Sequence, residues 1–236
     1  MRFLVFQHIA CEHPGLLKEL MRERGIAWDT VELAEGGAIP SLEGYAALLV
    51  FGGPMNVDEE TQFPWLTAEV STIREAVRRD VPYLGFCFGA QLLAKALGAP
   101  VTKAPQPEIG IMPVRLTPAG QADQLLAGLP PELPVFQWHG DTFALPPGAI
   151  HLAASPVCPH QAFRHGQAYG LQFHLEVTNE MVEEWGRVPE YLASLERLRG
   201  RGAMNWLRGE MAAHVSQLHA SCKTVFANFV RMIGPR

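Results

Sequence analysis

The stretch VPYLGFCFGAQLLAKALG, residues 81–98, decides the fold class of this chain. Its first part, residues 81–86, is an apolar run of the length of a buried strand, and residues 90–97 read as a helix that Gly98 ends. Between them lies Gly85-Phe86-Cys87-Phe88-Gly89, a G-x-C-x-G pattern whose glycines permit a sharp turn. We therefore expect a strand–turn–helix unit that exposes Cys87 at the turn.

This turn gives Cys87 two chemical advantages. The N-terminus of the following helix carries partial positive charge, which favours thiolate over thiol. The backbone N–H of Phe88 is expected to point to where negative charge develops during attack on a carbonyl. The pattern alone is equally typical of a buried cysteine packed between glycines. A nucleophile is therefore predicted only if the chain also supplies a base.

The segment GLQFHLE, residues 170–176, supplies this base. It reads as an apolar strand that ends in His174-x-Glu176, and alternate residues of a strand face the same side. His174 would take the proton of Cys87 and later return it to a leaving amine, while Glu176 orients the imidazole. Taken singly, each residue fits a strand-end histidine or a solvated carboxylate. Together with the turn, they predict a Cys-His-Glu triad.

Outward from the turn, strands and helices alternate over the first hundred residues, which implies a mostly parallel, doubly wound α/β sheet. The expected strands are residues 3–6, 26–33, 45–51 and 81–86, and the expected helices are 14–24, 65–79 and 90–97. After residue 100, short runs between Pro and Gly turns predict antiparallel strands along one side of the sheet. These runs are residues 109–116, 135–138, 149–154, 161–164 and 168–173.

From residue 178 onward the pattern is helical, with a break expected near Ala220-Ser221. We expect one domain over residues 1–236, in which helices flank the sheet and residues 178–236 form a helical C-terminal extension.

Two further segments lie at expected strand ends. The first, FGGP at residues 51–54, leaves a bare backbone, and the N–H of Gly53 could complete an oxyanion hole with that of Phe88. An ordinary Gly-Pro turn is the alternative. The second, WHGDT at residues 138–142, is a polar cluster that could bind the amino and carboxylate ends of a substrate. A capping or turn segment is the alternative there.

The sequences GFCFGAQLLA, FGGP, WHGD and GLQFHLE together resemble the class I (triad-type) glutamine amidotransferases, above all stand-alone members similar to the glutaminase domain of GMP synthetase. The likeness covers nearly the whole chain before the C-terminal helices. It implies a flavodoxin-like fold in which Cys87 attacks the side-chain amide of glutamine and forms a glutamyl thioester that water hydrolyses. It assigns the base to His174, its orienting partner to Glu176 and the oxyanion hole to Gly53 and Phe88. The expected substrate contacts are Gly52, Gln91, His139, Gly140 and Asp141.

The chain departs from the family pattern in places. Leu175 stands where members usually have Pro, and Ala90 where many synthetase-linked members have His. The second difference weakens the expected coupling to a synthetase. No P-loop or acceptor segment is recognisable, so ammonia is expected to pass to a separate synthetase subunit, or the enzyme acts only as a hydrolase. The same triad also fits a γ-glutamyl peptidase or conjugate hydrolase. A catalytically silent regulatory module is the remaining alternative.

Composition excludes other classes of function. The net charge is −5, with 48% hydrophobic and 18% charged residues, so a core can form and a nucleic-acid partner is not expected. The sequence shows no signal peptide and no apolar run of about 20 residues. We therefore expect no membrane association and a cytoplasmic location. Cys11, Cys87, Cys158 and Cys222 are scattered, which predicts free thiols. The histidines and cysteines show no ligand spacing, so we expect no metal and no cofactor.

Overall fold

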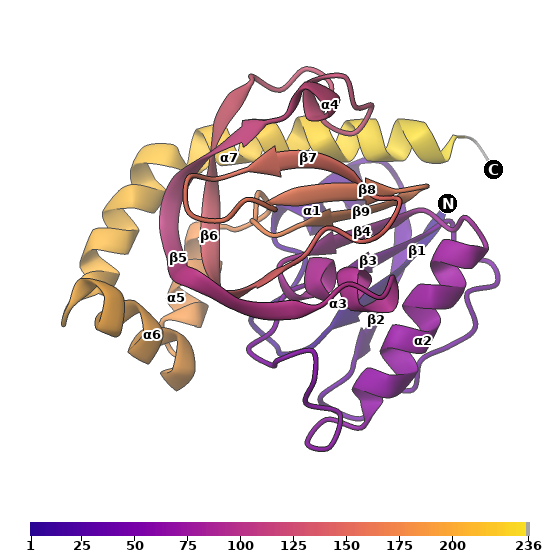
Figure 1. Cartoon of the computed structure of the whole chain (residues 1–236), viewed down its shortest axis with the longest axis horizontal. Helices are drawn as coiled ribbons and strands as arrows, with labels where there is room; N and C mark the ends of the chain where they lie inside the picture. The colour runs from indigo at the N-terminus through magenta and orange to yellow at the C-terminus, as the bar shows by residue number, and fades with distance from the viewer. Residues whose placement is uncertain (235–236) are drawn as a thin grey trace.

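The computed structural model describes residues 1–234, which form a nine-stranded sheet with helices on both faces (Figure 1). The strand order is β2-β1-β3-β4-β9-β8-β7-β5-β6. The strands are β1 (Arg2–Gln7), β2 (Ala27–Glu32), β3 (Ala47–Val50), β4 (Tyr83–Phe86), β5 (Val101–Leu116), β6 (Glu132–Phe143), β7 (Ile150–Ala154), β8 (Ala162–His165) and β9 (Ala168–Leu171). The helices are α1 (Leu16–Glu23), α2 (Trp65–Arg78), α3 (Phe88–Ala96), α4 (Pro118–Gln121), α5 (Asn179–Trp185), α6 (Pro189–Arg199) and α7 (Ala203–Ile233).

The sheet has a parallel half and an antiparallel half that meet at β9. Strands β2, β1, β3, β4 and β9 pair in parallel. On its other edge β9 pairs antiparallel with β8, and the strands β8, β7, β5 and β6 continue antiparallel. The predicted fold class is therefore confirmed. Because β4 and β9 are parallel neighbours, the chain leaves both strands at the same edge of the sheet, where doubly wound folds bind their ligands.

Two hydrophobic cores lie on the two faces of the sheet, because alternate residues of each strand point to opposite sides. In β1, Phe3 and Val5 belong to one core and Leu4 and Phe6 to the other. The first core includes buried side chains of α1 and α7, and the second those of α2 and α3. Figure 1 shows α7 running behind the sheet. Since Phe3 packs against Phe226 and Phe229, the two ends of the chain share one core, which supports our proposal that the chain is one domain.

Several boundaries differ from those expected, most of all in β5, in β6, which runs from Glu132 to Phe143 and not over residues 135–138, in β9 and in α7. Strand β5 begins at Val101, not at residue 109, because its first part pairs with the end of β6. Strand β9 ends at Leu171, so His174 and Glu176 lie beyond the strand. The break near Ala220-Ser221 was wrong, because α7 runs without interruption from Ala203 to Ile233.

The continuity of α7 has a physical reason. Ala and Ser are both tolerated in a helix, and the buried stripe continues from Leu218 to Cys222 and Val225 across the expected break. The last residues of the predicted extension, 235–236, lie outside the described residues.

Candidate active site

Cys87 occupies the tight turn between β4 and α3. Its backbone has a positive φ, with φ 49° and ψ −106°, a conformation that is costly for a residue with a Cβ. The flanking glycines are required by packing: a Cβ at Gly85 would collide with the backbone of Gly89, and one at Gly89 with the carbonyl of Val50. The N–H of Cys87 donates to the carbonyl of Leu171 at 2.8 Å, which ties the turn to the end of β9.

His174 and Glu176 form a buried pair directly after β9. The backbone of His174 exchanges hydrogen bonds with Phe136 on β6, of 2.8 and 3.1 Å, so residues beyond the strand are still fixed by the sheet. Nδ1 of His174 lies 2.6 Å from Oε1 of Glu176, whose Oε2 accepts the N–H of Leu175 at 2.9 Å. The imidazole packs edge-on against the ring of Trp185, 5.1 Å between centroids. These contacts leave one ring nitrogen available for other chemistry.

That nitrogen, Nε2 of His174, is buried without a hydrogen bond of normal geometry to any of residues 1–234. It nevertheless lies close enough to Cys87 for the two groups to change each other's pKa. Burial opposes the charged imidazolium, but the Glu176 carboxylate and Cys87 outweigh it and raise the pKa of His174 well above its usual value. The structure thus brings Cys87, His174 and Glu176 together.

The protonation of Cys87 differs from the expectation of a thiolate. Burial raises the pKa of the thiol, and His174 with the backbone N–H of Phe88 lowers it only in part. Only 6% of Cys87 is exposed, so the desolvation of a thiolate exceeds the benefit of the helix N-terminus. The sequence could not show this, because burial of the turn comes from the segments that cover it. Burial therefore favours a thiol over a thiolate at Cys87.

A cavity of about 430 Å³ opens onto Cys87. Its lining includes the predicted residues Gly53, Gln91, His139, Gly140 and Asp141. Gly52 and Phe88, which were also predicted for the site, do not line the cavity themselves. In the chain they adjoin Gly53 and Cys87, which do. The N–H of Gly53 has no acceptor among residues 1–234. Phe88 begins α3, where backbone N–H groups have no partner within the helix. Neither donor predicted for an oxyanion hole has a backbone acceptor among residues 1–234, and the N–H of Phe88 faces the sulfur of Cys87.

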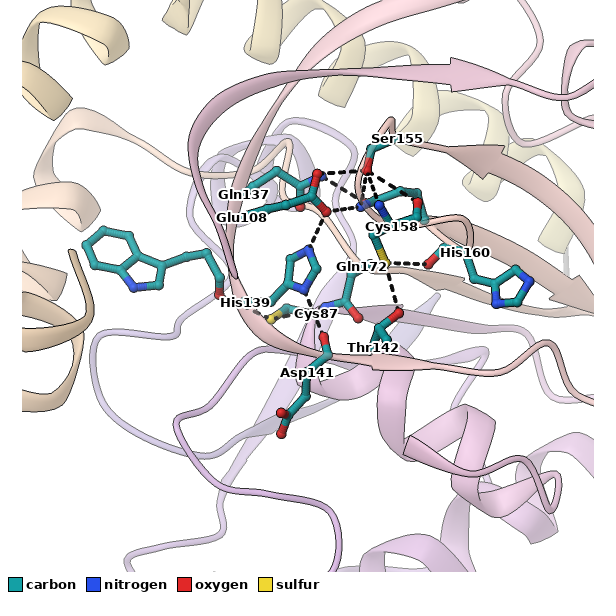
Figure 2. A network of polar contacts seen from close by, with 12 residues as sticks. Cys87, Glu108, Gln137, His139, Asp141, Thr142, Ser155, Cys158, His160 and Gln172 are labelled. Carbon is teal, nitrogen blue, oxygen red and sulfur yellow. Dashed lines mark hydrogen bonds and ion pairs between the residues drawn. The ribbon is translucent and has the colours of Figure 1, made fainter. Parts of the chain in front are cut away.

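The WHGDT segment is fixed by a buried polar network (Figure 2). His139 engages both ring nitrogens: Nε2 lies 3.1 Å from Glu108, and Nδ1 lies 2.8 Å from the carbonyl of Asp141. Glu108 also accepts from Ser155 at 2.7 Å and from Gln161 at 2.6 Å. Both nitrogens of the His139 imidazole are thus occupied by contacts within the protein. The network fixes the backbone of the WHGDT segment where it lines the cavity.

Gln91 connects this segment to the cysteine. Its Nε2 donates to the carbonyl of Asp141 and to Oε1 of Gln172, each at 3.2 Å. The amide of Gln172 in turn lies 3.7 Å from the sulfur of Cys87. The side chain of Asp141 forms an ion pair of 2.7 Å with Lys103 at the cavity. Gln91 and Asp141 therefore line the cavity while also holding its walls together.

Sequence reasoning missed two groups at this site, Glu12 and helix α6. Glu12 is buried, packs against Gly52 and accepts a hydrogen bond of 2.7 Å from the hydroxyl of Tyr191. Burial raises the pKa of Glu12. Tyr191 and Ser194 of α6 line the cavity, and Ser194 accepts from the indole of Trp138 at 3.2 Å. The C-terminal extension thus forms one wall of the site, which no local pattern around Glu12 or Tyr191 could have indicated.

Residues 1–234 were also compared with the requirements of a metal site and of a membrane-spanning helix. No group of three or more His, Cys, Asp or Glu side chains in this range is arranged to hold a metal ion. No helix in the same range is both long and apolar enough to cross a membrane.

The family model described as glutamine amidotransferase class-I matches residues 15–184. The glutamine amidotransferase-like protein YfeJ of Salmonella typhimurium is 36% identical over 189 residues, 78% of this chain and 79% of that protein. One subunit of the glutamine-hydrolyzing GMP synthase of Thermoplasma volcanium is 33% identical over 166 residues, 69% of this chain and 75% of that relative. Among solved structures, a glutamine amidotransferase from Thermotoga maritima is 31% identical with a TM-score of 0.90, covering 100% of this chain and 99% of that one.

Proposed function

The chain belongs to the glutamine amidotransferase class-I family, and on that premise we propose that Cys87 hydrolyses the side-chain amide of glutamine through a glutamyl thioester. The observation that carries this proposal is the unpaired Nε2 of His174 beside the sulfur of Cys87, with Nδ1 held by Glu176 at 2.6 Å. An imidazole held in this way can receive a proton at one defined nitrogen.

The reaction proceeds in two halves. Sγ of Cys87 attacks the amide carbon while its proton moves to Nε2 of His174, and the carbonyl oxygen becomes an oxyanion facing the N–H groups of Gly53 and Phe88. Collapse of this intermediate breaks the C–N bond, and His174 returns the proton to the leaving nitrogen, which departs as ammonia. Water then attacks the thioester with His174 as base, and the thiol leaves with its proton restored and glutamate released.

The buried, neutral thiol fits this sequence. Because burial raises the pKa of Cys87, a thiolate forms only as His174 accepts the proton. The neutral form of His174 accepts this proton. Because the pKa of His174 is raised, that form is a strong base, and Glu176 stabilises the resulting imidazolium. The nucleophile is thus generated with the substrate in place.

The product ammonia requires an acceptor. The relative from Thermoplasma volcanium is one subunit of a GMP synthase, which supports a separate synthetase subunit in the role of acceptor for this chain too. We propose that the ammonia passes to such a partner.

A second candidate function is hydrolysis of γ-glutamyl conjugates by the same residues. It is favoured by the cavity lining, in which Arg197 offers a cation for a second carboxylate in addition to Lys103, which is paired with Asp141. The ratio of kcat/KM for glutamine to that for γ-glutamyl dipeptides separates the candidates. A ratio well below one favours the conjugate hydrolase.

The replacement Cys87→Ala tests both candidates, since it removes the nucleophile. We expect hydrolysis to fall by on the order of 10⁶-fold, as happens when a nucleophile is deleted from a triad. The glutamine analogue 6-diazo-5-oxonorleucine should label Cys87 in the wild type and nothing in the variant, as read by intact-mass spectrometry. Cys222→Ala is the matched control, because Cys222 is buried in α7 and does not line the cavity, so labelling of Cys87 should persist in this variant. Normal turnover in Cys87→Ala would sink the proposal.

A further inference from the structure

His8 lies directly after β1 and is buried beneath the FGGP loop. Its side chain is completely inaccessible, as is that of Glu69 on α2. Nδ1 of His8 lies 2.8 Å from the carbonyl oxygen of Gly52, and Nε2 lies 3.0 Å from Oε1 of Glu69. Both ring nitrogens therefore have a partner, and the partner of Nδ1 is a backbone group of the loop.

Packing fixes the plane of this imidazole. The ring stacks on Trp65, with centroids 5.5 Å apart and planes 28° apart, and meets Phe88 edge-on at 4.9 Å. A Cβ at Gly53 would lie 3.1 Å from Cβ of His8, so the loop rests directly on this side chain. The ring can rotate neither away from Gly52 nor toward solvent.

The carbonyl that His8 holds belongs to the same peptide unit as the N–H of Gly53. This peptide bond is trans and planar, so its C=O and N–H point in opposite directions. Fixing the oxygen toward His8 therefore fixes the N–H away from it. Gly53 lines the cavity onto which Cys87 opens, and its N–H has no acceptor among residues 1–234.

We propose that His8 is a positioning residue, which together with Glu69 locks the Gly52–Gly53 peptide so that the Gly53 N–H faces the developing oxyanion at Cys87. The inference rests on the proposed function, because it presumes an oxyanion at this place. If the peptide turned over, its carbonyl would point at the oxyanion and repel it. With two glycines in the loop, the backbone has the freedom to turn, and a contact outside the loop has to prevent it.

The protonation of the pair agrees with this role. A carbonyl oxygen only accepts, so Nδ1 of His8 must carry a hydrogen. Burial opposes a second proton on the ring, but the Glu69 carboxylate and the Gly52 carbonyl prevail and raise the pKa of His8. Glu69 thus favours a ring that donates at both nitrogens, and the hydrogen on Nδ1 is kept.

Two amide replacements of His8 separate the contact with Gly52 from the contact with Glu69. The amide nitrogen of Asn reaches about the position of Nδ1, so His8→Asn keeps a donor for the Gly52 carbonyl. The amide nitrogen of Gln reaches about the position of Nε2, so His8→Gln keeps a donor for Glu69 and loses the one for Gly52. Both replacements retain a polar, hydrogen-bonding side chain in the buried site.

The experiment measures kcat and KM for glutamine, or for γ-glutamyl-p-nitroanilide if glutamine is turned over poorly, in both variants. We expect His8→Gln to lower kcat by about 10²-fold with little change in KM, which is the size of effect seen when one oxyanion donor is lost. His8→Asn should retain most of kcat. Alkylation of Cys87 by iodoacetamide involves no oxyanion, so its rate should be the same in both variants and the wild type, which also shows that the site is folded.

Three results overturn the inference: full kcat in His8→Gln, an equal loss of kcat in both variants, or a loss of alkylation that parallels the loss of kcat. The last two would mean that His8 only supports the fold or the thiol. Failure of the proposed function is a separate result, since it appears as absent turnover and absent diazo-oxonorleucine labelling in the wild type, before any replacement of His8.

Discussion

The His174–Glu176 pair and the His139–Glu108 pair are made of the same side chains and are equally inaccessible, yet their surroundings differ. His139 uses both ring nitrogens, one for Glu108 and one for the carbonyl of Asp141. His174 uses only Nδ1, and its Nε2 is left beside a sulfur. An imidazole with both nitrogens engaged can hold a wall in place, whereas one with a free nitrogen can move a proton. The environment of the second nitrogen therefore distinguishes the two pairs.

The pair of His8 and Glu69 extends this comparison. Like His139, His8 has both nitrogens occupied, but the carbonyl that it binds belongs to the loop predicted to form the oxyanion hole. Its proposed effect on catalysis is thus indirect and smaller than that of His174.

The largest effect should come from Glu176→Gln, which breaks the orientation of His174. Glu176 accepts from two donors, and the amide of Gln has only one oxygen. When that oxygen accepts from the N–H of Leu175, the NH2 group faces Nδ1 of His174, which needs an acceptor. The imidazole then takes the wrong tautomer, and we expect kcat to fall by on the order of 10⁴-fold, as in other triads. Steady-state hydrolysis measures this loss. Glu180→Gln, an exposed glutamate on the next helix, is the control and should keep full activity; an equal rate in both variants would contradict the comparison.

The next largest effect should come from Glu108→Ala and should appear in stability. Glu108 accepts hydrogen bonds from His139, Ser155 and Gln161, and the replacement removes all three and leaves Nε2 of His139 without a partner. Breaking a buried charged network in this way costs about 3–5 kcal/mol of the free energy of unfolding. Urea denaturation measures it.

Glu132→Ala provides the control for Glu108→Ala. Glu132 pairs with Arg115 on an exposed part of the sheet, where an ion pair contributes little, so the unfolding curve should hardly move. If Glu108→Ala were as stable as Glu132→Ala, the network would not have the structural role assigned to it.

The smallest effect concerns the proton on His174 and follows from the direction of its pKa. The folded protein binds this proton more tightly than the unfolded chain, whose histidine has a pKa of about 6.5. The resulting stability is fully present below about pH 6.5 and is lost as the pH rises through the folded pKa. The raised pKa of Cys87 acts in the same direction at more alkaline pH, because the unfolded thiol ionises first.

The free energy of unfolding should therefore fall with rising pH, by up to about 1.4 kcal/mol per pH unit for His174 alone. Thermal or urea unfolding from pH 6.5 to pH 9 measures the slope. His174→Ala should flatten it, and an unchanged slope in this variant would show that His174 does not hold the extra proton.

Much of the fold could be read from local patterns. Short apolar runs followed by amphipathic helices predicted β1, β3 and β4, because these strands are buried on both faces and need no particular partner to be recognised. The expectation that residues 168–173 belong to the antiparallel strands was wrong in part, because β9 pairs in parallel with β4 and antiparallel only with β8. The sequence did not predict the start of β5, the C-terminal end of β9 or the unbroken course of α7. Those features depend on pairing between β5 and β6 and on a continuous buried face of α7, which come from distant segments.

The sequence by itself singled out the proposed reactive residues, because the glycines around Cys87 and the spacing of His174 and Glu176 follow from local sterics and chemistry. Only the tertiary structure decided their environment. Parallel pairing of β4 with β9 brings Cys87 and His174 to one edge, and burial keeps the thiol protonated. Glu12, Tyr191 and the support of Gly52 by His8 were likewise invisible, because hydrogen bonds between residues 44 or 179 positions apart leave no periodic mark in a sequence.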